Sequence, residues 1–359
     1  SQIAGQLHGL REHSGKRPLH FARNAAWPVG QGYGSLHRFV LKFEAVNVRR
    51  GQGMEQVLAN VGGATAARLD LATLEGWQQG GKWFSYEGHA IFSRMAGSGE
   101  PLVLIHGFPT ASWDWNRLWP MLVQQHNVLT LDMLGFGFSD KPLNYDYSIE
   151  DQADLFQGWI EGLGLPSVHL LVHDYGCSVA QELLAREQEG GVPFRIASVC
   201  FLNGALFPEV HNPLLIQKLL RSPFGGLISR GLTRRTFERN FRRLFGSQNP
   251  PDRQDMEDFW HLLIYNNGRG ILHRLIQFME ERRCHRNRWV GALQKAKQPM
   301  RLISGTADPV SGAAMARRYR ELIPDADVVC LRNTGHYPHF ECPWDVFSAY
   351  RDLRKQCDQ

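Results

Sequence analysis

Short apolar runs alternate with longer, periodically apolar segments along most of the chain, and the alternation becomes regular from Gly81 onward. Apolar runs of a few residues predict strands, and apolar residues spaced three to four apart predict helices. The predicted strands are 82–85, 89–94, 101–107, 127–132, 168–173, 196–202, 300–304 and 327–331. The predicted helices are 54–77, 113–125, 148–163, 177–186, 255–265, 315–322 and 343–355. Strands that alternate with helices and are apolar on both faces favour an α/β fold, with a mostly parallel sheet covered by helices on both sides.

Residues 204–290 interrupt this alternation with a helical, Arg-rich stretch broken by prolines. Open α/β sheets bind ligands beyond the carboxyl ends of their strands. We therefore interpret 204–290 as an inserted helical cap over those ends, between core segments 54–203 and 291–359. Residues 1–53 show no sustained period, apart from one short candidate strand at 36–43. We expect 1–53 to be a basic, disordered extension, and one hypothesis is that translation starts at Met54.

The stretch Val168–Gly176 carries the strongest chemical signal. An apolar strand runs into a tight turn and then into a helix, with the spacing of a nucleophile elbow, which lifts one side chain above the sheet. The residue at the tip is Asp174. Free N–H groups at the start of the following helix favour its ionised form. An isolated Asp in this position is more often only a helix cap. Whether Asp174 is a nucleophile therefore depends on other residues of the chain.

Two further polar residues follow predicted strands near the C-terminus. Asp308 comes after strand 300–304, and His336 comes after strand 327–331. The order nucleophile, acid, histidine is that of α/β-hydrolases. The three side chains should meet at one sheet edge, with a His336 nitrogen within hydrogen-bond reach of Asp308.

Several motifs lie within roughly residues 80–355, and they are His106-Gly-Phe-Pro109, Gly135-Phe-Gly-Phe-Ser-Asp-Lys-Pro142, His173-Asp-Tyr-Gly176 and Gly335-His336. With these motifs the chain resembles the α/β-hydrolase superfamily, in the branch of epoxide hydrolases and haloalkane dehalogenases. A second set comprises Phe138-Ser-Asp-Lys-Pro142, His173-Asp-Tyr-Gly176, Leu214-Leu-Ile-Gln-Lys-Leu-Leu220 and Arg288-Trp-Val-Gly-Ala-Leu293. In this set the chain is similar to the family of the mesoderm-specific transcript protein.

The resemblance implies a two-step covalent mechanism. Asp174 would attack an electrophilic carbon to form an ester, and His336, oriented by Asp308, would activate the water that cleaves it. The main-chain N–H groups of Phe108 and Tyr175 would form the oxyanion hole. The expected substrate is small, apolar and electrophilic.

The substrate class is less sharply indicated. Haloalkane dehalogenases usually carry Trp after the nucleophile and often Asn after the His-Gly pair, where this chain has Tyr175 and Phe108. Epoxide hydrolases use the His-Gly-x-Pro form present here and a pair of cap tyrosines, of which the cap offers only Tyr265. We predict an epoxide hydrolase-like enzyme, with haloalkane dehalogenase as the alternative. Tyr265, Trp113 and His106 are candidate substrate-binding residues, although packing or loop-holding roles would explain all three.

Composition and charge narrow the remaining possibilities. The net charge of +5 is uneven, because residues 204–290 hold 15 Lys or Arg against 8 Asp or Glu, and residues 1–53 hold 8 against 2. A lipid-metabolising acyltransferase or hydrolase at a membrane surface, attracted by the basic cap, therefore stays open. So does a catalytically silent binding protein. The six cysteines have no metal spacing, and no glycine-rich phosphate loop is present. With no secretory signal or bilayer-spanning run, we expect a cytoplasmic enzyme without metal, cofactor or nucleic acid.

Overall fold

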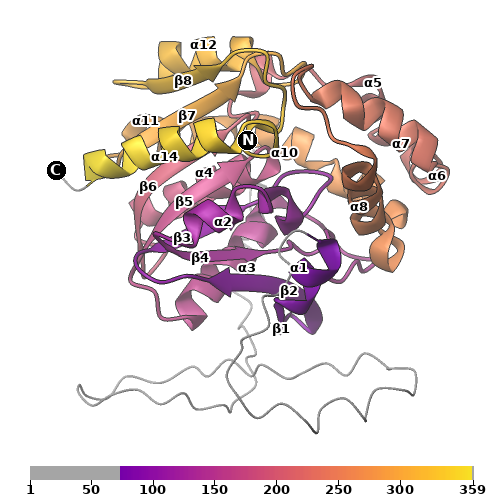
Figure 1. The fold of residues 1–359 in the computed structure, drawn as a ribbon, viewed down its shortest axis with the longest axis horizontal. Coiled ribbons are helices and arrows are strands. Elements are labelled where there is room, and N and C mark those ends of the chain that lie inside the picture. The colour runs from indigo at the N-terminus through magenta and orange to yellow at the C-terminus, as the bar shows by residue number, and fades with distance from the viewer. Residues whose placement is uncertain (1–72, 358–359) are drawn as a thin grey trace, which may run out of the picture.

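The centre of the molecule is an eight-stranded, mostly parallel sheet (Figure 1) in a computed structural model that describes residues 73–357. The strand order is β1-β2-β4-β3-β5-β6-β7-β8. β1 and β2 form an antiparallel hairpin, β2 pairs antiparallel with β4, and all later pairs are parallel. The strands are β1 Lys82–Tyr86, β2 His89–Ala96, β3 Pro101–Ile105, β4 Asn127–Leu131, β5 Ser167–His173, β6 Arg195–Leu202, β7 Met300–Gly305 and β8 Asp327–Leu331. The predicted α/β architecture is confirmed.

Helices cover both faces of this sheet. α4 contacts α3 and α11, and it packs on β3, β5 and β6. α14 packs on β6 and β7 and crosses in front of the sheet in Figure 1. The helices outside the segment between β6 and β7 are α1 Leu74–Gln79, α2 Trp119–Leu122, α3 Ile149–Gly162, α4 Tyr175–Gln188, α12 Ala313–Leu322, α13 Pro338–Glu341 and α14 Pro343–Cys357.

Local sequence accounts for where α3 begins and which side it buries. The Ser148 side chain accepts a hydrogen bond from the Asp151 N–H at 3.0 Å, which satisfies one of the free amides of the first turn. Glu150 and Asp151 place negative charge at the positive end of the helix dipole. The apolar side chains at helical spacing, from Ile149 to Ile160, are buried against the core.

The prediction of one continuous helix over 113–125 is wrong. The chain forms a short 3-10 helix, Ser112–Trp115, and then the separate helix α2. Pro120 lies in the first turn of α2. Proline has no N–H to continue an upstream helix and its ring clashes with the preceding turn, so a helix starts there and does not pass through.

The predicted N-terminal features lie almost wholly outside the described residues. This applies to the extension 1–53, the strand 36–43 and residues 54–72 of the predicted helix 54–77. The described part of that helix is α1, where the Thr73 side chain accepts from the Gly76 N–H.

The segment between β6 and β7 is helical, as the sequence predicts. It holds α5 Leu215–Leu220, α6 Gly225–Arg230, α7 Arg234–Phe241, α8 Arg253–Ile264, α9 Leu272–Leu275, α10 Phe278–Cys284 and α11 Arg286–Lys295. Figure 1 shows α5 to α8 together at one end of the sheet. The boundary predicted at residue 290 falls inside α11, which packs on α4. None of the helices within residues 73–357 is both long and apolar enough to cross a membrane.

Candidate active site

Asp174 occupies the sharp turn between β5 and α4. Its backbone has φ 42° and ψ −105°, a conformation that is strained for a residue with a side chain. Main-chain bonds hold the turn: the Asp174 N–H donates to Leu202 O at 3.2 Å, and the Gly176 N–H donates to His106 O at 3.1 Å. The turn therefore has the geometry of the elbow that the sequence predicts, with a carboxylate at its tip.

The Asp174 carboxylate is buried but surrounded by groups that favour its charge. The Phe108 N–H donates to Oδ2 at 3.1 Å, and the Arg282 guanidinium lies 3.6 Å from Oδ1. Burial alone would raise the pKa of Asp174. The positive charges of His336 and Arg282 outweigh it and hold the pKa below its usual value. The carboxylate is consequently ionised at neutral pH inside an otherwise apolar site.

Arg282 is the main site residue that sequence analysis missed. It projects from α10, and its side chain is 2% exposed. Its Nη2 donates to the Asp174 carbonyl oxygen at 3.1 Å, and its Nε donates to Ser178 Oγ at 2.7 Å. It therefore ties α10 to the elbow. Fifteen Lys and Arg residues in 204–290 look alike in sequence, so only burial distinguishes this one.

His336 and Asp308 form a short hydrogen bond next to Asp174. His336 Nδ1 lies 2.7 Å from Asp308 Oδ2, and its Nε2 lies 4.0 Å from Asp174 Oδ1. The expected convergence of Asp174, Asp308 and His336 is therefore observed. Burial would lower the pKa of His336, but Asp308 and Asp174 outweigh it and raise the pKa to about 9. The resting imidazole is a cation between two carboxylates.

Asp308 is held by hydrogen bonds that fix the orientation of its carboxylate. Its Oδ2 accepts from Asn203 Nδ2 and Ser311 Oγ, each at 2.8 Å, and its Oδ1 accepts from the Val310 N–H at 2.8 Å. Burial raises its pKa, and the His336 cation together with these donors outweighs burial and lowers the pKa to about 2. Asn203 and Ser311 are further residues that the sequence did not single out, since their role depends on contacts between distant loops.

The main-chain groups expected to form an oxyanion hole lie beside Asp174. The Phe108 N–H already contacts the carboxylate. Tyr175 is the first residue of α4, and the first amides of a helix have no partner within it. The Tyr175 ring packs in the core against Phe136 and Phe278, with centroids 5.6 and 5.0 Å away.

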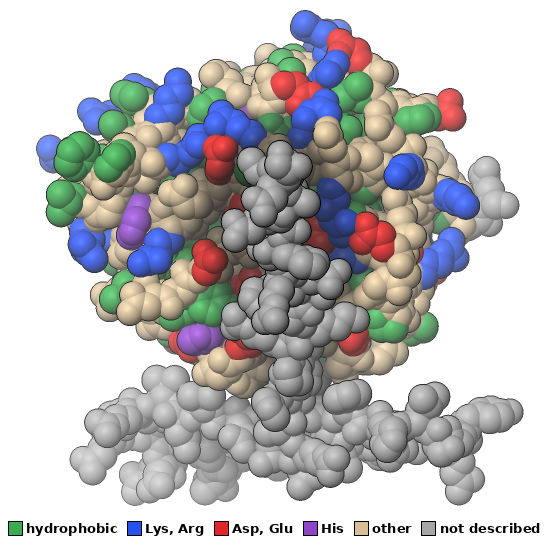
Figure 2. Space-filling view, turned by 180° about the vertical axis from the view of Figure 1, so that it is seen from behind, with side chains coloured by type: hydrophobic (Ala, Val, Ile, Leu, Met, Phe, Trp, Pro, Cys, Tyr) green, Lys and Arg blue, Asp and Glu red, His purple; other side chains and the backbone are tan. Residues whose placement is uncertain are grey.

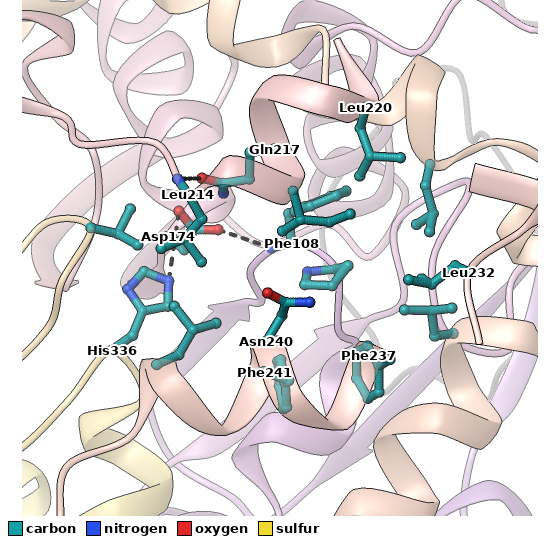
Figure 3. Close-up of a pocket in the computed structure, with 16 residues that line it drawn as sticks. Phe108, Asp174, Leu214, Gln217, Leu220, Leu232, Phe237, Asn240, Phe241 and His336 are labelled. Carbon is teal, nitrogen blue, oxygen red and sulfur yellow. Dashed lines mark hydrogen bonds and ion pairs between the residues drawn. The ribbon is translucent and has the colours of Figure 1, made fainter. Parts of the chain in front are cut away.

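A cavity opens in front of Asp174 and His336 and holds about 680 Å³ of empty space, the solvent-open mouth included (Figure 3). Asp174 and His336 lie at one end, and Leu232 and Phe237 lie toward the other. The walls come largely from the helices α5, α7, α8 and α9. The lining residues are Phe108, Pro109, Asp174, Leu214, Ile216, Gln217, Leu220, Leu232, Phe237, Asn240, Phe241, Leu244, Leu263, Leu272, Val310 and His336. Such a cavity suits a largely apolar ligand.

Gln217 and Asn240 add two polar groups to this apolar lining. Gln217 Oε1 accepts from the Leu214 N–H at 2.8 Å, and Asn240 Nδ2 donates to Thr236 O at 2.8 Å. The Gln217 NH₂ group donates no hydrogen bond to any residue of 73–357. It is a donor available to a polar atom of a ligand.

The structure corrects the three candidate substrate-binding residues, since Tyr265, Trp113 and His106 do not line the cavity. Tyr265 directly follows the last residue of α8 and packs edge-on against Phe138, with centroids 5.3 Å apart. Trp113 is 2% exposed and packs in the core.

His106 has a loop-holding role. Its Nε2 accepts from the Met133 N–H at 3.0 Å, and its Nδ1 lies 2.9 Å from Gly107 O. Burial lowers its pKa. A neutral, fully bonded imidazole joins two loops at this position.

A fully buried polar cluster lies behind His336. His173 Nε2 is 2.8 Å from the His336 carbonyl oxygen, and the His173 ring packs against that of His339, with centroids 4.5 Å apart. A carboxylate oxygen of Asp114 and one ring nitrogen each of His173 and His339 all lie within 4.8 Å of one another. Through His173, the cluster supports the loop that carries His336.

Comparison with known proteins identifies the family. A family model described as alpha/beta hydrolase fold matches residues 100–343. The chain belongs to the α/β-hydrolase fold family. The mesoderm-specific transcript homolog protein of Bos taurus is 41% identical over 291 residues, covering 77% of this chain and 86% of that protein.

Haloalkane dehalogenases are also similar to this α/β-hydrolase. One from Agrobacterium fabrum is 33% identical over 110 residues, covering 31% of this chain and 34% of that protein. The crystal structure of the haloalkane dehalogenase DbeA from Bradyrhizobium elkani aligns with a TM-score of 0.67 at 18% identity, covering 77% of this chain and 97% of that chain. These findings support a hydrolase with haloalkane dehalogenase-like relatives.

Proposed function

We propose that the protein is a hydrolase in which Asp174 attacks an alkyl carbon of an apolar substrate and forms a covalent ester. The observation that carries the proposal is an ionised carboxylate at the end of an apolar cavity, with His336 Nε2 only 4.0 Å from Oδ1. A carboxylate that attacked an acyl group would form an anhydride, whereas attack at an alkyl carbon forms an ester that water can cleave.

In the first step, the Asp174 carboxylate supplies the electron pair for the new carbon–oxygen bond. Oδ2 is held by the Phe108 N–H, so Oδ1 is the oxygen free to attack. The bond between the substrate carbon and its leaving atom breaks at the same time. A halogen departs as halide, whereas an epoxide oxygen stays on the substrate and takes a proton from water. No base is needed, because the nucleophile is already ionised.

In the second step, His336 changes role because the charge next to it changes. Once Asp174 is esterified, one of the three carboxylates that raise the pKa of His336, those of Asp308, Asp174 and Glu341, has lost its charge. The imidazole can then lose its proton and take one from water, which adds to the ester carbonyl carbon. Asp308 stabilises the imidazolium that forms. The Phe108 and Tyr175 N–H groups stabilise the developing oxyanion. The ester carbon–oxygen bond then breaks, the alcohol oxygen takes the proton held by His336, and Asp174 returns to its carboxylate by releasing the second proton of the water to solvent.

An epoxide is the proposed substrate class, with a haloalkane as the second candidate. Strain in a three-membered ring assists attack by a carboxylate, and the His-Gly-x-Pro sequence at 106–109 matches the epoxide hydrolase form. The haloalkane reading draws support from the similar dehalogenases. In either reaction, the free Gln217 NH₂ group is the side-chain donor that could stabilise the leaving oxygen or halide.

A substrate panel tests this proposal. The full chain is incubated with terminal epoxides and 1-haloalkanes of graded chain length, and diol and halide release are measured. We expect diol release that Asp174→Ala abolishes. Halide release without diol would favour the second candidate. Hydrolysis of a carboxylic ester that Asp174→Ala leaves intact would contradict the aspartate mechanism.

A further inference from the structure

The outer surface of α5 and α6 exposes large apolar side chains. Leu215, Leu219, Phe224 and Leu227 are 72%, 41%, 69% and 70% exposed. α5 and α6 pack against each other, so these four residues form one surface, named here the α5–α6 patch. Single exposed apolar residues are ordinary, but a contiguous group marks a surface that binds a partner or a membrane.

The opposite side of α5 is a wall of the active-site cavity. Ile216, Gln217 and Leu220 line the cavity, and Leu220 is 5% exposed. One short helix therefore separates the α5–α6 patch from the space in front of Asp174. Whatever the patch binds lies one helix diameter from the site.

All charged residues in the chain segment around the patch are basic. Residues 210–237 contain no Asp or Glu, but they contain Lys218, Arg221, Arg230, Arg234 and Arg235. Arg221 and Arg234 pair with Glu280 and Glu238.

Other cations of this stretch are uncompensated. Within residues 73–357, Lys218, Arg230 and Arg235 are exposed and have no carboxylate at ion-pair distance. Figure 2 shows hydrophobic and basic side chains intermixed along the left edge, where the reversed view places α5 and α6. The surface thus combines an apolar face with excess positive charge.

We propose that the α5–α6 patch binds the surface of a lipid bilayer that contains anionic lipid. Apolar side chains on short interfacial helices enter the boundary between headgroups and acyl chains, while Lys and Arg beside them attract anionic headgroups. A second copy of the chain is a poorer partner. A symmetric contact would place these uncompensated cations opposite their own kind.

Vesicle cosedimentation of the full chain, without substrate, tests this proposal independently of the proposed function. Mixed phosphatidylcholine–phosphatidylserine vesicles should bind the protein, and pure phosphatidylcholine vesicles should bind it less. Phe224→Ser/Leu227→Ser should weaken binding to the mixed vesicles by about tenfold or more. Lys218→Glu/Arg230→Glu should weaken it and reduce its dependence on salt. Trp344→Ser is the matched control, because Trp344 is 71% exposed on α14, outside the patch. It should bind as the wild type does.

Two outcomes would overturn the proposal. The first is a failure to bind vesicles as proposed. Either the wild type does not sediment at all, or both patch variants sediment as much as the wild type does. The latter result would assign lipid binding to another segment, such as the basic residues 1–53. The other is a dimer in solution that Phe224→Ser/Leu227→Ser dissociates while vesicle binding is absent. That result would assign the patch to a second copy.

Discussion

At the scale of single residues, the site depends on charges that stabilise one another in a buried place. His336 is the clearest case, because burial lowers its pKa but the carboxylates of Asp308, Asp174 and Glu341 outweigh burial and raise the pKa to about 9. A folded-state pKa above the unfolded value of about 6.5 means that the protonated group stabilises the fold. That stabilisation is complete below about pH 6.5 and is lost as the pH rises through about 9.

The measurable consequence is a fall in stability on the alkaline side. The free energy of unfolding of the wild type should decrease between about pH 6.5 and 9, by an amount on the order of a few kcal/mol. His336→Gln, which carries no titrating imidazole, should show a flatter profile over the same range. Denaturant unfolding of both proteins at several pH values measures the difference. Parallel profiles would contradict the assigned protonation state.

Arg282 should act on the reaction through Asp174. Removing the guanidinium leaves the buried carboxylate with less compensation, so the pKa of Asp174 should rise. Arg282→Met should therefore lose activity on the acidic side at a higher pH than the wild type. It should also be less stable, by roughly 3–5 kcal/mol. The pH profile of ester formation is the readout that a purely structural role would not move. Arg283→Met, at the exposed neighbouring position, should leave that profile unchanged.

At the scale of secondary-structure elements, the elbow works because a helix starts very close to a strand end. A Cβ atom on Gly176 would lie 2.5 Å from Ile105 O and 2.8 Å from His106 O, both backbone atoms that cannot move aside cheaply. Gly176→Ala should therefore destabilise the protein by about 1–3 kcal/mol, and it should slow ester formation because the carboxylate shifts.

Gly291 offers the matched control for that substitution. It lies inside α11, and a Cβ there would meet nothing within 4 Å. Gly291→Ala should be neutral or stabilise the protein by up to about 1 kcal/mol, as Ala favours helix over Gly. Thermal unfolding of Gly176→Ala and Gly291→Ala measures the difference in stability. Equal destabilisation of the two variants would contradict the claim that a Cβ at Gly176 clashes with the backbone.

The sequence predicted elements well where local pattern determines structure. The apolar runs located all eight strands, and the residues that follow three of them, Asp174, Asp308 and His336, were assigned to one place because parallel strands end at one sheet edge. Prediction failed where the deciding contact is distant in sequence. Arg282 lies 108 residues from Asp174, and no periodicity marks it. Tyr265 was a candidate because of its residue type, but the end of α8 directs it onto Phe138.

At the scale of the whole molecule, the cavity and the α5–α6 patch lie on two sides of the same helix. If the patch binds bilayers, substrates dissolved in lipid should reach the cavity more readily than through bulk water. Phe224→Ser/Leu227→Ser should then lower turnover of a long-chain epoxide presented in anionic vesicles, while leaving turnover of a short, water-soluble epoxide unchanged. Initial rates with both substrates measure this. An equal loss on both substrates would indicate damage to the site instead.

Intact-mass spectrometry of His336→Gln is the sharpest test of a covalent ester at Asp174. Ester formation needs no base, but its hydrolysis does, and loss of a general base slows that step by about a hundredfold to ten-thousandfold. Incubated with any substrate that the wild type turns over, His336→Gln should gain the mass of one alkyl adduct, which peptide mapping should assign to Asp174. Asp174→Ala should gain none. An unmodified His336→Gln protein, or an adduct on a residue other than Asp174, would contradict the mechanism.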